Sequence, residues 1–274
     1  MSSHRTAVWV VNGLLLGLCA LSGFPLLWMV SVSFMPPGAS STLPVSLWPR
    51  SPTWANYRAL FSTLGMGRYL LNSLGIATLA TAVSLVFNVS AGYAFAKLPF
   101  PGRDAVFKAM LGALVIPGQV AMLPLFLMLK TMGLVNTYAG AVVPAMAGVF
   151  GIFLVRQFAR SIPDELLEAA RIDGASEFRI FLTIVLPLLG PVLATLAIFS
   201  FLGSWNDFMW PLIVLTDDAL HTLPVALAGL SREHVQDNEM MMAGSVITVL
   251  PVLLLFLALQ RQYIAGLMAG GVKA

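Results

Sequence analysis

Long apolar runs alternate with short polar segments along the chain. A helix needs about 20 mostly apolar residues to cross the hydrocarbon core of a membrane. Six runs are this long, and none of them carries a charged side chain at its centre. The pattern predicts an all-α integral membrane protein with six transmembrane helices, at about residues 8–33, 70–96, 107–129, 138–157, 181–204 and 243–261.

The polar connections between these runs differ in character. Residues 35–69 contain five prolines, and proline removes a backbone donor and favours extended backbone in the residue before it. We therefore expect an ordered loop rather than a helix in this connection. Residues 158–180 are polar with a helical pattern, whereas residues 207–242 form a long and rather acidic connection.

Two polar interruptions lie inside the apolar runs. Pro117, Gly118 and Pro124 break the third run, and Gln119 lies between them. Backbone groups that proline frees in lipid must be satisfied by neighbouring helices or by a wet cavity. The break therefore indicates either a translocation path or a packing kink, and the sequence leaves both open. Asn88 in the second run favours an interhelical hydrogen bond, with a substrate contact as the second interpretation.

Composition and charge agree with a membrane protein. The chain is 58% hydrophobic and 10% charged, with a mean hydropathy of +0.88, whereas soluble domains contain about 25% charged residues. No basic run accompanies the net charge of +3, which argues against nucleic-acid binding. The single Cys19 cannot form a disulfide within the chain. The first apolar run is longer than a typical cleaved signal sequence, so we expect it to remain as the first transmembrane helix.

The distribution of basic residues predicts the orientation of the chain, because cytoplasmic loops carry an excess of Lys and Arg. With a cytoplasmic N-terminus, ten of the 15 basic residues lie inside and five outside. Six spans then place both termini in the cytoplasm. The inner residues are Arg5, Lys97, Arg103, Lys108, Arg156, Arg160, Arg171, Arg179, Arg261 and Lys273, and the outer ones are Arg50, Arg58, Arg68, Lys130 and Arg232.

The connection from Ser161 to Arg179 is rich in charge. It contains seven of the 27 charged residues of the chain, which are 12 acidic and 15 basic. Ser161 is expected to cap a short helix, whose end at Gly174 would use a positive φ. A second helix is expected to start near Ser176. The apolar side of the first helix is predicted to consist of Leu166, Leu167, Ala170 and Ile172. Such a helix either transmits force from a soluble partner or lies on the lipid headgroups.

The same connection resembles a known motif. Glu168-Ala169-Ala170, Gly174 and Ile184-Val185-Leu186-Pro187 follow the pattern EAA-x3-G-x9-I-x-L-P without a gap. This pattern is similar to the EAA loop of the permeases of binding-protein-dependent ABC importers. Trp205-Asn206-Asp207-Phe208 and the break at Ile116-Pro117-Gly118-Gln119 resemble the sugar-importer branch, of the maltose type. The resemblance covers about residues 55–274, whereas the first run matches only in general character.

The resemblance implies a type I ABC importer transmembrane domain in the bacterial inner membrane, over residues 1–274. Residues 1–69 would form the first span and outer loop, and about 70–265 the permease core. The coupling helix would dock in a cytoplasmic ATPase, and a solute-binding protein outside would deliver a sugar. A second, homologous permease would complete a heterodimer, and no cofactor is expected. The coupling residues implied are Glu168, Ala169, Ala170 and Gly174, with Leu166 and Asp173 beside them.

The candidate translocation path consists of Gln119, Asn88, Asn206 and Asp207. Asn206 and Asp207 lie at the outer end of the fifth run, and the sequence does not decide between a path lining and an interfacial position for them. Trp205 and Trp210 are expected in the aromatic belt at the membrane surface, where Trp is enriched.

Other classes of protein fit the sequence less well. The chain lacks the G-x4-G-K-[ST] phosphate loop, so we expect a separate ATPase subunit and no enzymatic activity here. An ion-coupled secondary transporter is the alternative, although proton-coupled carriers place ionisable residues inside their spans. Sodium coupling through backbone carbonyls stays open. A membrane enzyme is disfavoured because the three His residues lack metal-ligand spacing.

Overall fold

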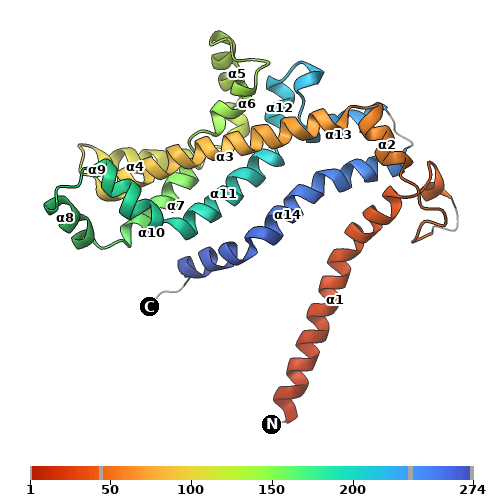
Figure 1. Cartoon of the computed structure of the whole chain (residues 1–274), viewed down its shortest axis with the longest axis horizontal. Helices are drawn as coiled ribbons and strands as arrows, with labels where there is room; N and C mark the ends of the chain where they lie inside the picture. The colour runs from red at the N-terminus through yellow and green to blue at the C-terminus, as the bar shows by residue number, and fades with distance from the viewer. Residues whose placement is uncertain (1, 43–45, 234–236, 272–274) are drawn as a thin grey trace. The chain divides into compact units, whose positions relative to one another are not determined.

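Helices are the only regular elements in the part of the chain that the computed structural model describes, residues 2–42, 46–233 and 237–271. Figure 1 gives the order of the helices. The chain divides into two compact units, Met1–Gly67 with Ala226–Pro251, and Arg68–Val225 with Val252–Ala274. Lys273, one of the inner basic residues, and His234 lie outside the described residues.

The first unit contains the predicted first span. Helix α1 (Ser2–Ser33) includes an apolar stretch, Val8–Ser33, that is long enough to cross a membrane, and residues 8–30 of it are not buried against the rest of the protein. Its apolar side chains are therefore available to lipid. The start of α14 (Asn238–Gly271) also belongs to this unit. The stretch Asn238–Ala258 confirms the sixth predicted span, with an earlier start.

The loop expected over residues 35–69 contains a helix, so that prediction is wrong in part. Helix α2 (Ala55–Ser62) begins after Pro52, the last of the five prolines, where the backbone donors return. Asn56 holds α2 against the end of α1, because its buried amide donates to the carbonyls of Ser33 (2.9 Å) and Met35 (2.8 Å). Among the described residues of this connection, Ala39–Ser41 form a 3₁₀ helix, and residues 46–54 and 63–65 are irregular.

The second unit contains one unbroken predicted span, α3 (Met66–Lys97). The third, fourth and fifth predicted spans are bent pairs rather than straight helices. The bend in the third span confirms the break expected at Pro117 and Gly118, whereas the bends in the fourth and fifth spans were not predicted. The bends are 97° between Arg103–Ala113 and Gly118–Thr131, 45° between Tyr138–Ala145 and Val149–Arg160, and 80° between Glu177–Leu188 and Gly190–Trp205. By length and composition, the described residues hold three spans, or up to six if each bent pair counts as one.

Proline and glycine account for the bends. The first bend precedes Pro117 and Gly118, the second lies between Pro144 and Gly148, and the third is followed at once by Gly190 and Pro191. Proline removes an intrahelical donor and clashes with the preceding turn. The elements of these pairs are α4 (Arg103–Ala113), α5 (Met122–Thr131), α6 (Tyr138–Val142), α7 (Val149–Arg160), α9 (Glu177–Ile180), α10 (Leu186–Leu188) and α11 (Gly190–Trp205).

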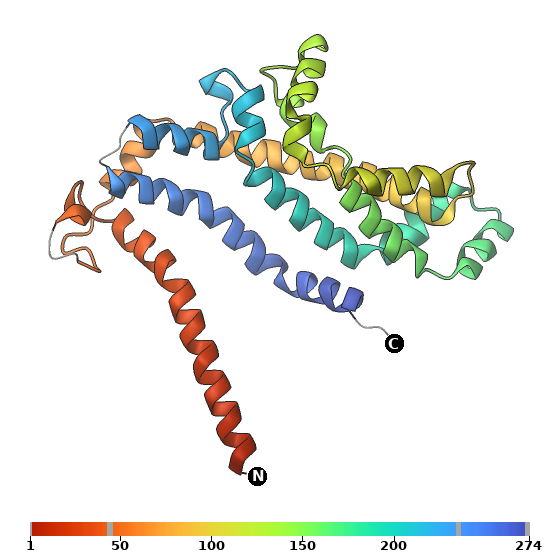
Figure 2. The ribbon, with the colours of Figure 1, turned by 180° about the vertical axis from the view of Figure 1, so that it is seen from behind.

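Close helix packing forms the core of the second unit. Figures 1 and 2 show α3, α7 and α11 side by side, and buried apolar side chains from all three meet in one cluster. A Cβ at Gly92 of α3 would lie 2.6 Å from the Cβ of Val155 of α7. The two helices can approach this closely because Gly92 has no side chain, as small residues allow in membrane bundles. A second cluster joins α3 and α5 to α6 and α12 (Met209–Val214).

Candidate functional site

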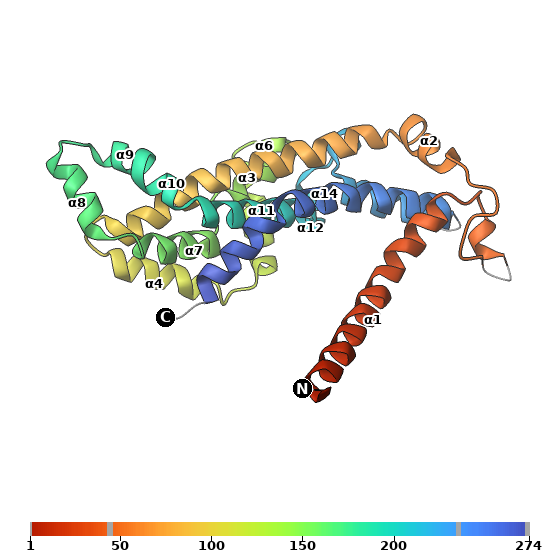
Figure 3. The same cartoon turned by 60° about the horizontal axis from the view of Figure 1, so that its bottom comes forward.

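The predicted helix of the polar connection is α8 (Asp164–Ile172), which lies next to α9 in Figure 3. It begins later than expected, because α7 continues to Arg160. The Ser161 hydroxyl donates back to the Phe158 carbonyl (2.7 Å), so Ser161 closes α7 and the predicted N-cap of α8 is wrong. Pro163 precedes α8 instead and offers no side-chain cap. Asp164 occupies the first turn, where the helix dipole favours an acidic residue.

The end of α8 confirms the predicted glycine bend. Gly174 has φ +81°, in the left-handed region. The Gly174 N–H donates to the Arg171 carbonyl (3.0 Å), and the Ala175 N–H donates to the Ala170 carbonyl (2.9 Å). These two bonds form a Schellman motif, which ends a helix at a glycine. The next helix, α9, starts directly after Ser176, as expected, and the Ser176 hydroxyl accepts the Arg179 N–H there.

The apolar residues of α8 do not share one side, so that expectation is wrong. Leu167 is 1% exposed and belongs to the core cluster, and Ala170 packs against the same cluster. Leu166 is 43% exposed and Ile172 is 86% exposed. Ala169 and Asp173 are also exposed. Positions 166, 169 and 172 follow a spacing of three, so α8 presents an outward apolar strip in addition to its buried contact.

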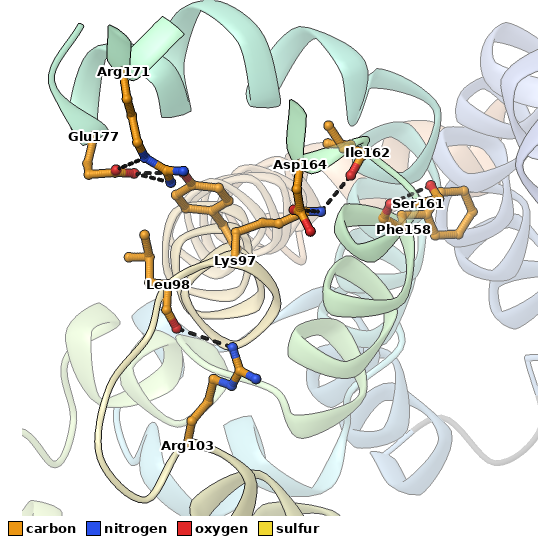
Figure 4. A network of polar contacts seen from close by, with 10 residues as sticks. Lys97, Leu98, Arg103, Phe158, Ser161, Ile162, Asp164, Arg171 and Glu177 are labelled. Atoms are coloured by element: carbon orange, nitrogen blue, oxygen red, sulfur yellow. Dashed lines mark hydrogen bonds and ion pairs between the residues drawn. The ribbon is translucent and has the colours of Figure 1, made fainter. Parts of the chain in front are cut away.

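Ion pairs surround α8, as Figure 4 shows. The Lys97 ammonium lies 2.6 Å from Asp164 Oδ1 and also donates to the Ile162 carbonyl. Arg171 Nε lies 2.6 Å from Glu177 Oε1. The hydrogen bond from Lys97 lowers the pKa of Asp164, and the hydrogen bond to Glu177 raises the pKa of Arg171. Asp164 and Arg171 are therefore both charged at neutral pH.

A polar cavity of about 750 Å³ opens beside α8. Glu168 lines it together with Arg103, Arg156 and Arg160. Arg156 is held by the Phe95 carbonyl (3.2 Å from Nε), by Asp104 (3.7 Å) and by the ring of Phe107. Within the described residues, Glu168 has no hydrogen bond or ion pair of its own. The glutamate of the motif therefore faces basic side chains of its own chain.

A second cavity, of about 500 Å³, lies among the bent spans. We call it the central cavity. Apolar side chains and glycines make up more than half of its lining, and hydroxyl and amide side chains, aromatic rings and one carboxylate complete it. The residues used below are Ser84, Asn88, Gln119, Phe150, Phe199, Ser200, Ser204, Asp207 and Trp210.

Three of the four candidate path residues line this cavity. Asn88 is 1% exposed, donates to the Ser84 hydroxyl (2.7 Å) and accepts from the Gly148 N–H (2.8 Å). The predicted interhelical hydrogen bond of Asn88 is thus confirmed. Gln119 lies at the bend before α5, and Asp207 follows α11. Asn206 does not line the cavity, and its amide donates to the Leu202 carbonyl instead (2.9 Å).

The two tryptophans of the fifth span are buried, which contradicts the expected surface belt. Trp205 is 1% exposed and stacks on Phe201, with 5.8 Å between ring centroids. Trp210 is 6% exposed, and its indole N–H donates to the Gly140 carbonyl (3.1 Å). Trp210 of α12 packs in the cluster with residues of α3, α5 and α6, and hydropathy along the chain does not predict that contact.

Sequence reasoning missed several residues at these two sites. Ser84 lies four residues before Asn88, and this helical spacing was a signal that could have placed it in the cavity. Tyr93 and Lys97 of α3 bind the α8 region across more than 60 positions of sequence, and no local pattern predicts such pairs. No group of three or more metal-ligating side chains lies together among the described residues.

Comparisons with known proteins agree with this arrangement. Residues 8–266 match the family described as binding-protein-dependent transport system inner membrane component. The arabinooligosaccharides transport system permease protein AraQ of Halalkalibacterium halodurans is 41% identical over 253 residues, which cover 91% of each chain. The trehalose transport system permease protein SugB of Mycobacterium tuberculosis is 33% identical over 278 residues and covers 100% of both chains.

A solved structure has the same fold. It is the crystal structure of a bacterial ABC transporter involved in the import of the acidic polysaccharide alginate. One of its chains matches with a TM-score of 0.82 and 23% identity, covering 94% of this chain and 97% of that one. The helical architecture is therefore that of an ABC importer permease.

Proposed function

The chain belongs to the family of binding-protein-dependent transport system inner membrane components and is a permease subunit of an ABC importer, and we propose that the solute it passes is a sugar. The names of its relatives support this class, because AraQ is named for arabinooligosaccharides and SugB for trehalose. Membership in this family decides against the ion-coupled alternative.

The central cavity is the proposed translocation path, and its lining is the observation that carries the proposal. Ser84, Asn88 and Gln119 offer hydroxyl and amide groups that match sugar hydroxyls. Phe150, Phe199 and Trp210 add aromatic surface, which suits the apolar faces of a sugar ring. Asp207 supplies the one charge among the described lining residues.

The outward strip of α8 is the proposed contact with a separate ATPase subunit. Leu166, Ala169 and Asp173 are exposed there, and the small Ala169 permits close approach. Gly174 and Ala170 shape the end of the helix through the Schellman motif. Glu168 forms no close ion pair in the described part of this chain, so its carboxylate is available to a basic group of the ATPase at the edge of the polar cavity.

The proposed assembly has this chain beside a second, homologous permease, with ATPase subunits at α8 and a solute-binding protein on the other side of the membrane. The chain itself hydrolyses no ATP in this scheme. Both termini and α8 lie in the cytoplasm, as the two-to-one bias of basic residues predicts. The chain acts as one permease domain over residues 1–274.

Reconstitution tests this proposal. The chain is purified with the second permease, the ATPase and the binding protein encoded beside it, and is placed in proteoliposomes. Labelled trehalose and arabinooligosaccharides serve as probes, with a labelled amino acid as the control solute. We expect sugar uptake that requires both ATP and the binding protein. Uptake driven by a proton or sodium gradient without ATP, or uptake of the amino acid alone, would contradict the proposal.

A further inference from the structure

Helix α8 buries little apolar surface against the rest of the chain. Its nine residues include one buried side chain, Leu167. The charged and polar residues of the helix are exposed, and Ala170 is only half-buried. A helix of this length gains little stability by itself in water. Its direction therefore depends on polar contacts at its two ends.

Lys97 forms the contact at the first end. Its side chain is 5% exposed, and the ammonium donates both to Asp164, the first residue of α8, and to the Ile162 carbonyl just before it. A buried ammonium requires an ionic or hydrogen-bonding partner. Because these partners belong to α8 and to the residues that lead into it, Lys97 fixes the start of α8 to α3.

Glu177 forms the contact at the second end. Its carboxylate accepts two hydrogen bonds from Arg171 of α8, at 2.6 and 3.3 Å. It also accepts the hydroxyl of Tyr93 at 3.2 Å. One carboxylate thus joins α8, α9 and α3. Charge-assisted and bidentate hydrogen bonds of this kind constrain geometry more than neutral ones.

Both contacts arise from one stripe of α3. Tyr93 and Lys97 are four residues apart, so they lie one above the other on the same side of the helix. Asn88 and Ser84, which line the central cavity, also belong to α3. The close contact of Gly92 with Val155 limits how α3 can slide past α7.

We propose that Tyr93 and Lys97 are positioning residues that make α3 follow α8. A displacement of α8 then reaches Asn88 and Ser84 through one continuous helix. This inference rests on the proposed role of α8 as the contact with the ATPase. The displacement of α8 then travels through α3 as well as through the chain connections of α8 with α7 and α9.

Two substitutions remove the contacts with little loss of packing. Tyr93→Phe deletes the hydroxyl and keeps the ring beside Phe181, at 5.2 Å between centroids. Lys97→Met keeps the length of the apolar stem and removes the ammonium. The matched control is Lys108→Met, which removes an exposed cation of α4.

We expect the double variant Tyr93→Phe/Lys97→Met to hydrolyse ATP in the assembled importer but to import about tenfold less sugar per ATP, the effect expected for losing hydrogen bonds to charged groups. Lys108→Met should keep the wild-type ratio. Lys97→Glu combined with Asp164→Lys reverses the ion pair and should restore most of the ratio that Lys97→Glu alone loses. An unchanged ratio in the double variant, or no recovery in the charge reversal, overturns the proposal.

A distance measurement separates this inference from the proposed function. Spin labels are placed at Glu165→Cys on α8 and at the exposed Phe87→Cys on α3, in the assembled importer with Cys19→Ser. We expect a narrow distance distribution in the otherwise wild-type chain and a broad one in Tyr93→Phe/Lys97→Met. A distribution that stays narrow in the variant overturns the role of Tyr93 and Lys97 in holding α8 to α3. If the wild-type importer moves no sugar, the proposed function fails. The distance distributions still test whether Tyr93 and Lys97 hold α8 to α3.

Discussion

The surroundings of α8 and the central cavity, both in the second unit, use polar groups in opposite ways. Around α8, opposite charges meet in pairs, Lys97 with Asp164 and Arg171 with Glu177, each at 2.6 Å. In the central cavity, the polar groups are neutral hydroxyls and amides set among apolar side chains and glycines, and Asp207 is the one charged residue among the described lining residues.

This difference indicates a division of tasks. Paired charges hold a fixed geometry, which suits a helix that must transmit a displacement. Neutral hydrogen-bonding groups are less costly to expose and cover again than charges are, which suits a cavity through which a solute passes. Substitutions around α8 should therefore decide whether transport occurs, whereas substitutions in the central cavity should decide which solute is transported.

The largest expected effect is at the glycine that ends α8. Gly174→Pro forces φ from +81° to about −65° and deletes the N–H that donates to Arg171. We expect sugar uptake and binding of the ATPase to be lost, while the protein still inserts in the membrane because its apolar spans are unchanged. Uptake in proteoliposomes and co-purification of the ATPase measure the two effects.

Gly174→Ala is the matched control for this change. A Cβ at Gly174 meets no atom within 4 Å, so the cost is the strain of a positive φ alone. That strain is about 1–2 kcal/mol, and uptake should decrease without being abolished. Normal uptake by Gly174→Pro at wild-type expression would show that α8 is only an interfacial anchor.

A smaller effect is expected at the unpaired carboxylate of the motif. Glu168→Lys adds a cation to the polar cavity that already contains Arg103, Arg156 and Arg160. Repulsion should turn the side chain outward and weaken ATPase docking, with a loss of uptake of about tenfold. Glu168→Gln removes the charge without reversing it and should lose less. Equal uptake by both variants and the wild type would remove Glu168 from the coupling contact.

The contrast between the two regions also shows what the sequence can predict. Two features that depend on local backbone chemistry were confirmed, the positive φ of Gly174 at the end of α8 and the start of the next helix near Ser176. The predicted span of α3 was also confirmed, since its apolar run is uninterrupted and forms one helix. Local patterns therefore predicted these helices and the glycine end of α8, but not its start, because the Ser161 hydroxyl closes α7 instead.

Features that depend on distant partners were missed. Hydropathy did not predict that Trp210 is buried, because its indole N–H binds the carbonyl of Gly140, 70 residues away. The single apolar side expected for α8 was wrong, because Leu167 and Ala170 meet the core that α3, α7 and α11 build, whereas Leu166 and Ile172 are exposed. Gln119 and Asp207 were selected as polar residues near breaks and helix ends, and it is the bends of the spans that bring them to one cavity.

The smallest expected effect concerns selectivity rather than rate. Asp207→Asn removes the one charge of the described cavity lining but keeps the side-chain oxygen that accepts the backbone N–H of Trp210 at 3.3 Å, so the fold around it should persist. A carboxylate in a partly dry site repels an anionic solute by about 4 kcal/mol at a separation of 4 Å with an effective dielectric constant near 20. Uptake of a neutral disaccharide should therefore change by less than about twofold, whereas uptake of a disaccharide that bears a uronic acid should rise relative to it.

Asp218→Asn, the same substitution at an exposed position outside the cavity, should leave the ratio of the two uptakes unchanged. If Asp207→Asn and Asp218→Asn give the same ratio, the charge of Asp207 does not act on the solute, and the central cavity does not select against anions through this chain.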